Sequence, residues 1–147
     1  MSVFADSSAL VKLYVPELGH EVVRALTSPL VISMLARAEV PAALWGKSRT
    51  GELSTSDASV LVSAFEFDYH GDNRANSTFA IIAVGESILV EAARYSARHS
   101  LRAYDAVQLA SVIAARDADP MVDTFAVFDV KLRAAAIAEG FFVLETD

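Results

Sequence analysis

Near the start of the chain stands the stretch Val3-Phe4-Ala5-Asp6-Ser7-Ser8-Ala9-Leu10. A short apolar run ends in a carboxylate, two hydroxyl side chains follow, and an apolar helical pattern then begins. The run predicts a strand over residues 2–6, and Asp and Ser are both favoured at a helix N-terminus. In open α/β sheets, ligands bind beyond the carboxyl ends of the strands. The stretch therefore fits a helix cap and also a candidate site at Asp6.

Apolar runs and helical patterns alternate along the rest of the chain. The runs that predict strands lie at 30–32, 79–84, 124–128 and 142–144. The patterns that predict helices lie at 8–15, 19–26, 35–49, 54–65, 86–98, 103–116 and 130–139, and the polar segment 67–77 is expected to be a loop. Strands that alternate with helices imply βαβ units. We therefore expect an α/β fold with a mostly parallel sheet, helices on both of its faces, and a single domain over residues 1–147.

The composition limits the classes of protein to which the chain can belong. Of its 147 residues 54% are hydrophobic, which is enough for a sizeable core and leaves apolar surface for a partner chain or a dimer. The chain has no cysteine, which excludes disulfides and thiol catalysis and fits the cytoplasm. A net charge of −7 argues against a simple nucleic-acid binder, but not against an enzyme that gathers acids in one site.

Two kinds of targeting segment are not expected. The first residues have neither the basic region nor the long apolar region of a signal peptide. The purest apolar run, residues 79–84, is far shorter than a membrane span, so no membrane association is expected.

Asp129 repeats the pattern of Asp6. It follows the apolar run 125–128 and precedes a predicted helix, so it too stands at the carboxyl end of a strand. Each of the two residues fits an N-cap and a site at the edge of a parallel sheet.

Asp105 and Glu39 are harder to assign to structural roles. Asp105 shares the helical stripe of Leu109, which should face the core. It fits a capping box with Gln108, whereas a helix that begins at 102–104 would leave Asp105 in the first turn, pointing inward. Glu39 is expected mid-helix on a largely apolar segment, where a buried carboxylate is costly unless it is paired. A salt bridge to a nearby Arg or a partly exposed position would also account for it.

The four carboxylates acquire a common explanation if they converge at one edge of the sheet. Two carboxylates about 4 Å apart repel by roughly 4 kcal/mol at an effective dielectric constant of 20. Hard cations that prefer oxygen ligands, Mg²⁺ or Mn²⁺, would relieve this repulsion. Without cysteine, and with three scattered histidines, the chain offers little for zinc. Such a site points to metal-activated water that attacks a phosphodiester.

Four segments of the chain carry a resemblance to a known family. They are Asp-Ser-Ser-Ala-Leu-Val-Lys-Leu-Tyr (6–14), Arg-Ala-Glu-Val-Pro-Ala-Ala-Leu (37–44), Leu-Arg-Ala-Tyr-Asp-Ala-Val-Gln-Leu-Ala (101–110) and Phe-Asp-Val-Lys-Leu-Arg-Ala-Ala-Ala (128–136). In this order they resemble the four acidic motifs of PIN domains, and most closely those of VapC-like ribonuclease toxins of bacterial type II toxin–antitoxin modules. The resemblance covers essentially the whole chain, although residues 54–77 match only in general character.

The resemblance implies a PIN-like three-layer fold with four to five strands and the activity of a Mg²⁺-dependent endoribonuclease, with Mn²⁺ as a substitute. Asp6, Glu39, Asp105 and Asp129 would form the catalytic metal site, in which Asp6 and Asp105 are the residues most expected to bind the metal directly. Ser7 or Ser8 would assist through a hydroxyl or a backbone amide. The resemblance also implies a cognate antitoxin that blocks the site, and a homodimer.

Basic and aromatic side chains elsewhere in the chain are candidates for contact with the RNA substrate. The basic candidates for its backbone are Arg37, Lys47, Arg49, Arg98, His99 and Arg102, each of which also fits an ordinary surface charge. Trp45 and Tyr104 fit base stacking, although core packing is the commoner role for both.

Three alternatives belong to other classes of protein. A phosphorelay receiver would need adjacent acids after the first strand, and a haloacid-dehalogenase-type phosphatase would need an Asp at position 8, where Ser8 stands. A non-catalytic scaffold with a PIN fold remains open, and loss of one acid would favour it; all four acids are present.

Overall fold

The computed structural model describes residues 1–27, 29–71 and 77–145. Five parallel strands form one sheet in the order β3-β2-β1-β4-β5. The strands are β1 (Ser2–Ala5), β2 (Val31–Ser33), β3 (Ala80–Ile82), β4 (Val122–Ala126) and β5 (Phe142–Val143). The parallel α/β sheet expected from the sequence is therefore confirmed.

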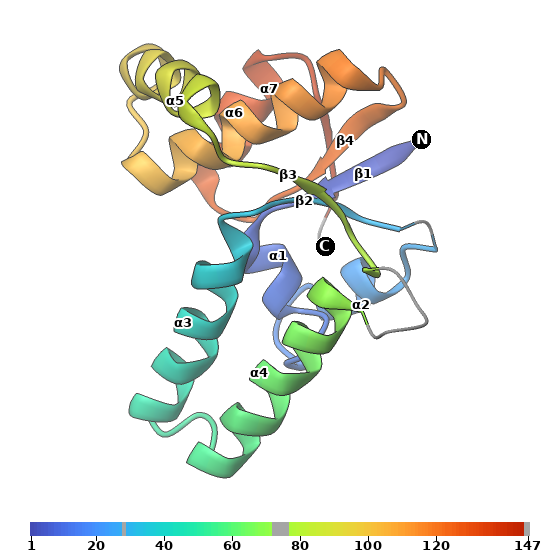
Figure 1. Ribbon diagram of the computed structural model, residues 1–147, viewed down its shortest axis with the longest axis vertical. Coiled ribbons are helices and arrows are strands. Elements are labelled where there is room, and N and C mark those ends of the chain that lie inside the picture. The colour runs from blue at the N-terminus through green and yellow to red at the C-terminus, as the bar shows by residue number, and fades with distance from the viewer. Residues whose placement is uncertain (28, 72–76, 146–147) are drawn as a thin grey trace.

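Helices cover both faces of this sheet, as Figure 1 shows. On one face lie α1 (Ser7–Val11), α2 (His20–Arg24), α3 (Ala36–Arg49) and α4 (Thr55–His70). On the other lie α5 (Glu86–His99), α6 (Ala103–Ala118) and α7 (Val130–Ala138). Side chains alternate between the faces of a strand. Val3 and Ala5 therefore pack with the first group of helices, and Phe4 packs with the second. The Phe4 and Phe125 rings form an edge-to-face pair with their centroids 5.3 Å apart.

The strand order reverses beside β1. The chain moves from β1 outward to β2 and β3, and then returns to place β4 on the other side of β1. The backbone N–H of Asp6 donates to the Ala126 carbonyl, which joins the carboxyl ends of β1 and β4. Such a switch point is where open α/β sheets form a ligand crevice, because the connections diverge to opposite faces. The fold thus places the residues after β1 and β4 side by side.

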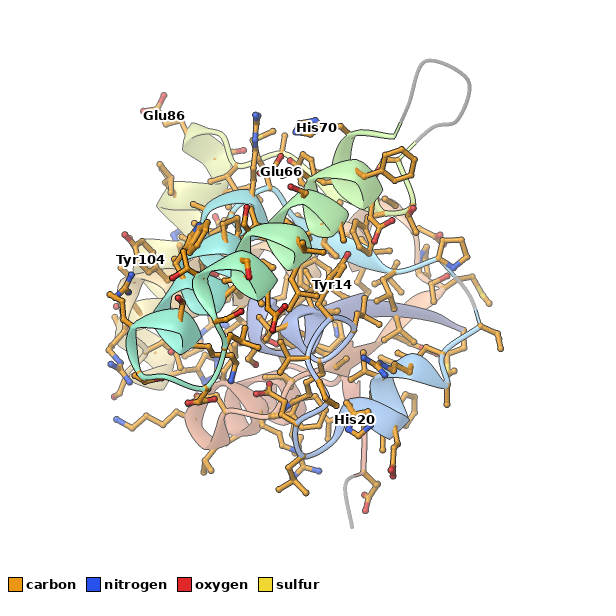
Figure 2. The ribbon with its side chains drawn as sticks, turned by 90° about the horizontal axis from the view of Figure 1, so that it is seen from below. Tyr14, His20, Glu66, His70, Glu86 and Tyr104 are labelled. Atoms are coloured by element: carbon orange, nitrogen blue, oxygen red, sulfur yellow. The ribbon has the colours of Figure 1, made fainter. Side chains whose placement is uncertain are left out.

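The loop predicted over residues 67–77 is wrong in its first part, because α4 continues to His70. The Tyr14 hydroxyl, in the turn after α1, donates to Asp68 at 2.7 Å, and the Tyr14 ring packs against Phe65 of α4, so contacts with this turn hold the polar end of α4 helical. Tyr14 and His70 are labelled in Figure 2. Gly71 ends the helix with a φ of 72°, a conformation that suits glycine. Residues 72–76 of the predicted loop lie outside the described part of the chain.

Other boundaries also differ from the sequence prediction, and two of them bear on the site. The helix predicted over 8–15 ends at Val11, because the bonds from Lys12 to Ala9 and from Leu13 to Leu10 tighten to three-residue spacing. The fourth strand ends at Ala126 and not at residue 128, so Asp129 lies three residues beyond it. Among the residues described, none of the helices is long and apolar enough to traverse a lipid bilayer.

Candidate active site

A pocket of about 500 Å³ opens at the switch point between β1 and β4. Ten residues from four separate segments line it: Asp6, Ser7, Ser8, Glu39, Arg102, Ala103, Tyr104, Asp105, Gln108 and Asp129. All four carboxylates singled out in the sequence are among them. The structure therefore brings these side chains to a single pocket, while their role as catalytic metal ligands stays a prediction.

Asp6 is the most deeply buried of the four acids, with 5% of its surface exposed. Its carboxylate caps α1 by accepting from the Ala9 backbone N–H at 2.9 Å, and the Ser8 hydroxyl donates to both of its oxygens. The residue is thus a helix cap and a wall of the pocket at once. Burial raises its pKa to about 7, aided by the nearby charges of Glu39 and Asp105 and opposed by the bonds from Ala9 and Ser8.

Glu39 lies in the first turn of α3, not mid-helix as the sequence suggested, because α3 begins only at Ala36. Its Oε1 accepts from the Ser7 hydroxyl at 2.9 Å and from the Gln108 side-chain amide at 2.9 Å. Within the described residues Glu39 has no Lys or Arg partner, so the ion pair considered as an alternative is not found, whereas the partly exposed position is. Neutral donors hold this half-buried carboxylate beside the other acids.

Asp105 lies in the first turn of α6 and is half-buried. The helix begins at Ala103 with Arg102 in the cap position, so the earlier start considered for this helix is correct. The capping box of Asp105 with Gln108 is wrong, because the Gln108 amide turns away to Ser7 and Glu39. Burial raises the pKa of Asp105, and the charges of Asp129 and Glu39 add to this effect.

Asp129 is the most exposed of the four acids and caps α7. Its Oδ2 accepts from the Leu132 backbone N–H at 2.9 Å. As with Asp6, the cap fixes the carboxylate near its helix N-terminus without removing it from the pocket.

The acids alone do not form a closed metal cage. Over residues 1–27, 29–71 and 77–145, no three His, Cys, Asp or Glu side chains converge tightly enough to hold a bare ion. Magnesium usually keeps several of its water ligands and takes only one or two carboxylates directly. A pocket of this volume with four carboxylates on its walls fits such a hydrated cation, and the raised pKa values of Asp6 and Asp105 show the electrostatic cost that a cation would relieve.

Gln108 is the residue of the pocket that sequence reasoning did not recognise as part of it. It is 2% exposed, and its amide nitrogen donates to both Ser7 and Glu39. Its Oε1 is buried and has no donor within the described chain. The only signal in the sequence is a lone amide one turn beyond Asp105 on an apolar helix, a pattern that also fits a capping box.

The basic and aromatic candidates divide into two groups. Arg102 and Tyr104 line the pocket, and Tyr104 is 65% exposed at the periphery of the molecule, so its predicted core role is wrong (Figure 2). Others lie away from the pocket in contacts of their own: Lys47 pairs with Glu17 and Glu52, Arg98 and His99 contact Glu139, and Arg37 lies over Tyr69. Trp45 is half-buried.

Comparison with curated proteins identifies the family. Ribonuclease VapC45 of Mycobacterium tuberculosis is 35% identical over 141 residues, which cover 94% of this chain and 91% of the relative. The chain belongs to the VapC family of ribonucleases. No protein-family model matches the chain.

Solved structures share the fold of this VapC-family chain at much lower identity. Mycobacterium tuberculosis VapC20, described as a sarcin-ricin loop cleaving toxin, aligns with a TM-score of 0.63 and 16% identity over 91% of this chain and 95% of its own. A toxin–antitoxin complex from Klebsiella pneumoniae aligns with a TM-score of 0.58 and 17% identity over 99% and 97% of the two chains. The expected PIN-like fold class is confirmed.

Proposed function

We propose that this VapC-family chain is a Mg²⁺-dependent endoribonuclease and the toxin of a toxin–antitoxin pair. The observation that carries the proposal is the meeting of Asp6, Glu39, Asp105 and Asp129, from four distant segments, on the walls of one pocket. Family membership supplies the ribonuclease class, and the acidic walls supply oxygen ligands that suit Mg²⁺ or Mn²⁺. When bound, the cation supplies an acidified water and neutralises charge that develops on the phosphate.

The chain's own residues provide a prearranged acidic frame for this chemistry. Asp6 is held by Ser8 and by the start of α1, and Glu39 is held by Ser7 and Gln108, so neither has to reorganise when the substrate arrives. Asp105 and Asp129 complete the walls from the other face of the sheet. Fixed groups of this kind lower a barrier because their orientation is settled before the reaction.

The rim of the pocket offers contacts for RNA and for an antitoxin. Arg102 is the basic side chain among the lining residues, and it can bind a phosphate next to the scissile bond. Tyr104 presents an exposed ring on which a base can stack. The antitoxin would cover this rim and exclude RNA, as family membership and the Klebsiella toxin–antitoxin neighbour suggest.

We also propose that the protein acts in the cytoplasm as a homodimer. The large apolar side chains that remain exposed, such as Leu89 and Val90 on α5, are suited to contact with a second chain or an antitoxin helix.

Removal of divalent cations is expected to abolish RNA cleavage. Purified protein should cleave a mixed RNA substrate with Mg²⁺ or Mn²⁺ and lose the activity in EDTA, because four carboxylates without a cation repel the phosphate. Gel electrophoresis of labelled RNA measures the cleavage, and restoration by added Mg²⁺ is the control. EDTA-resistant cleavage would contradict the metal mechanism. A wild-type protein that binds Mg²⁺ but cleaves no RNA would favour the scaffold alternative.

Magnesium binding is expected to weaken as the pH falls below 7. The pKa of Asp6 is raised to about 7 by burial, so below this pH a proton on Asp6 competes with the cation. At pH 6 the protonated form dominates by about ten to one, and the affinity for Mg²⁺ should be about tenfold lower than at pH 8. Titration calorimetry at both pH values measures the difference. Equal affinities at the two pH values would contradict a raised Asp6 pKa that makes a proton compete with the cation.

A further inference from the structure

A side-chain triangle links α1, α3 and α6 at the floor of the pocket. The Gln108 Nε2 donates to the Ser7 Oγ at 3.1 Å and to the Glu39 Oε1 at 2.9 Å, and the Ser7 hydroxyl donates to the same Oε1 at 2.9 Å. Both donors are buried, with 8% of Ser7 and 2% of Gln108 exposed. Two buried donors therefore fix one oxygen of Glu39. Within the described chain no group donates to the other oxygen, Oε2, which stays available to a ligand.

The orientation of the Gln108 amide follows from the chemistry of its neighbour. An ionised carboxylate only accepts hydrogen bonds, so the amide nitrogen and not the oxygen must face Glu39. This orientation leaves the Gln108 Oε1 buried without a protein donor, at a residue that lines the acidic pocket. An unpaired buried acceptor is unfavourable, so the fold bears a cost to keep the amide nitrogen on Glu39. This cost indicates that the amide nitrogen has a role in holding the Glu39 carboxylate at the pocket.

We propose that Gln108 is a positioning residue for the metal site: its amide nitrogen fixes the Glu39 carboxylate, although this orientation leaves its own amide oxygen buried without a donor in the described chain. The inference rests on the proposed metal-dependent function, which it extends to a neutral residue of α6. Gln108 does not act on the reacting atoms. It sets the affinity of the site for its cation, as groups that hold metal ligands from behind generally do.

The test compares Gln108→Met, which keeps the size of the side chain but not its hydrogen bonds, with the wild-type protein. Titration calorimetry with Mn²⁺ should show an affinity about 10–100-fold lower for the variant. A large excess of Mg²⁺ should restore RNA cleavage to within a few-fold of wild type, because the reacting groups are intact. An Asp6→Asn variant should not be rescued in this way.

Ser111→Ala is the matched control, because Ser111 is buried on the same helix and donates to Ser33, outside the pocket. Its affinity for Mn²⁺ should be within about twofold of wild type, whether or not its melting temperature falls. If Gln108→Met fails to fold, Ser7→Ala removes a donor to the same Glu39 oxygen and should weaken Mn²⁺ binding in the same direction. Unchanged Mn²⁺ affinity in a folded variant, or cleavage that excess Mg²⁺ does not restore, would overturn the inference. Failure of the wild-type protein to bind any divalent cation would instead refute the proposed function.

Discussion

An Asp6→Asn variant is expected to cleave RNA about 10³-fold more slowly than wild type and yet to be more stable without metal at pH 8. One unit of charge near a cation is worth about 4 kcal/mol at 4 Å and an effective dielectric constant of 20, which corresponds to about three powers of ten in rate. The asparagine oxygen can still accept from the Ala9 N–H, so the cap on α1 is kept.

The gain in stability follows from the direction of the Asp6 pKa shift. The folded-state pKa, about 7, lies above the ordinary value of 3.8, so the ionised form destabilises the fold. This cost is absent below pH 3.8, grows as the pH rises, and is complete above pH 7, where it reaches at most about 4 kcal/mol. Asparagine removes the charge, so its advantage should be largest at pH 8 and shrink toward pH 4.

Thermal melting in EDTA at pH 8 and pH 5 measures this effect, with a gain of several degrees expected at pH 8. Asp6→Ala is the control, because it removes the charge and also the cap, and should be less stable than Asp6→Asn by about 1 kcal/mol. An Asp6→Asn protein that retains full activity would exclude Asp6 from the site.

The second large effect is expected for Asp105→Asn, which should also lose about 10³-fold in cleavage rate and no longer arrest growth on expression. Within the described residues the Asp105 side chain takes part in no hydrogen bond or ion pair, so the change removes charge without removing a structural contact. Because burial and the charges of Asp129 and Glu39 raise its pKa, the fold should be as stable as wild type or slightly more so.

Asp117→Asn is the matched control for this experiment. Asp117 is an exposed carboxylate on the same helix, about 18 Å further along the helix axis. This variant should keep both cleavage and growth arrest. Cleavage of RNA and counts of viable cells after induction measure the two effects. Full toxicity of Asp105→Asn, with the protein present at wild-type level, would remove Asp105 from the proposed mechanism.

Local sequence patterns predicted the strands, the helices and the four acidic residues of the candidate site. The run Val3–Ala5 is apolar and ends at Asp6, and this pattern alone predicts a buried strand that delivers a carboxylate to a helix N-terminus. The alternation of such runs with helical patterns predicted the parallel sheet, because parallel strands need helical crossovers. The order of the four acidic segments indicated the family, which the 35% identity to VapC45 confirms.

Local pattern failed where contacts distant in the sequence decide the outcome. The end of α4 looked like a polar loop, but Tyr14, 54 residues away, holds Asp68. Gln108 fitted a capping box with Asp105. Its amide nitrogen instead donates to Ser7, 101 residues away, and to Glu39.

The pocket itself belongs to the tertiary structure. Sequence patterns identify the four carboxylates as candidate site residues. Only the strand order β3-β2-β1-β4-β5 places the ends of β1 and β4 side by side and opens a crevice between them. Strand order follows from which apolar faces pack together across the whole chain, and no local segment contains that information. For the same reason the burial of Asp6, and with it the raised pKa that distinguishes it from a surface helix cap, exists only once the chain is folded.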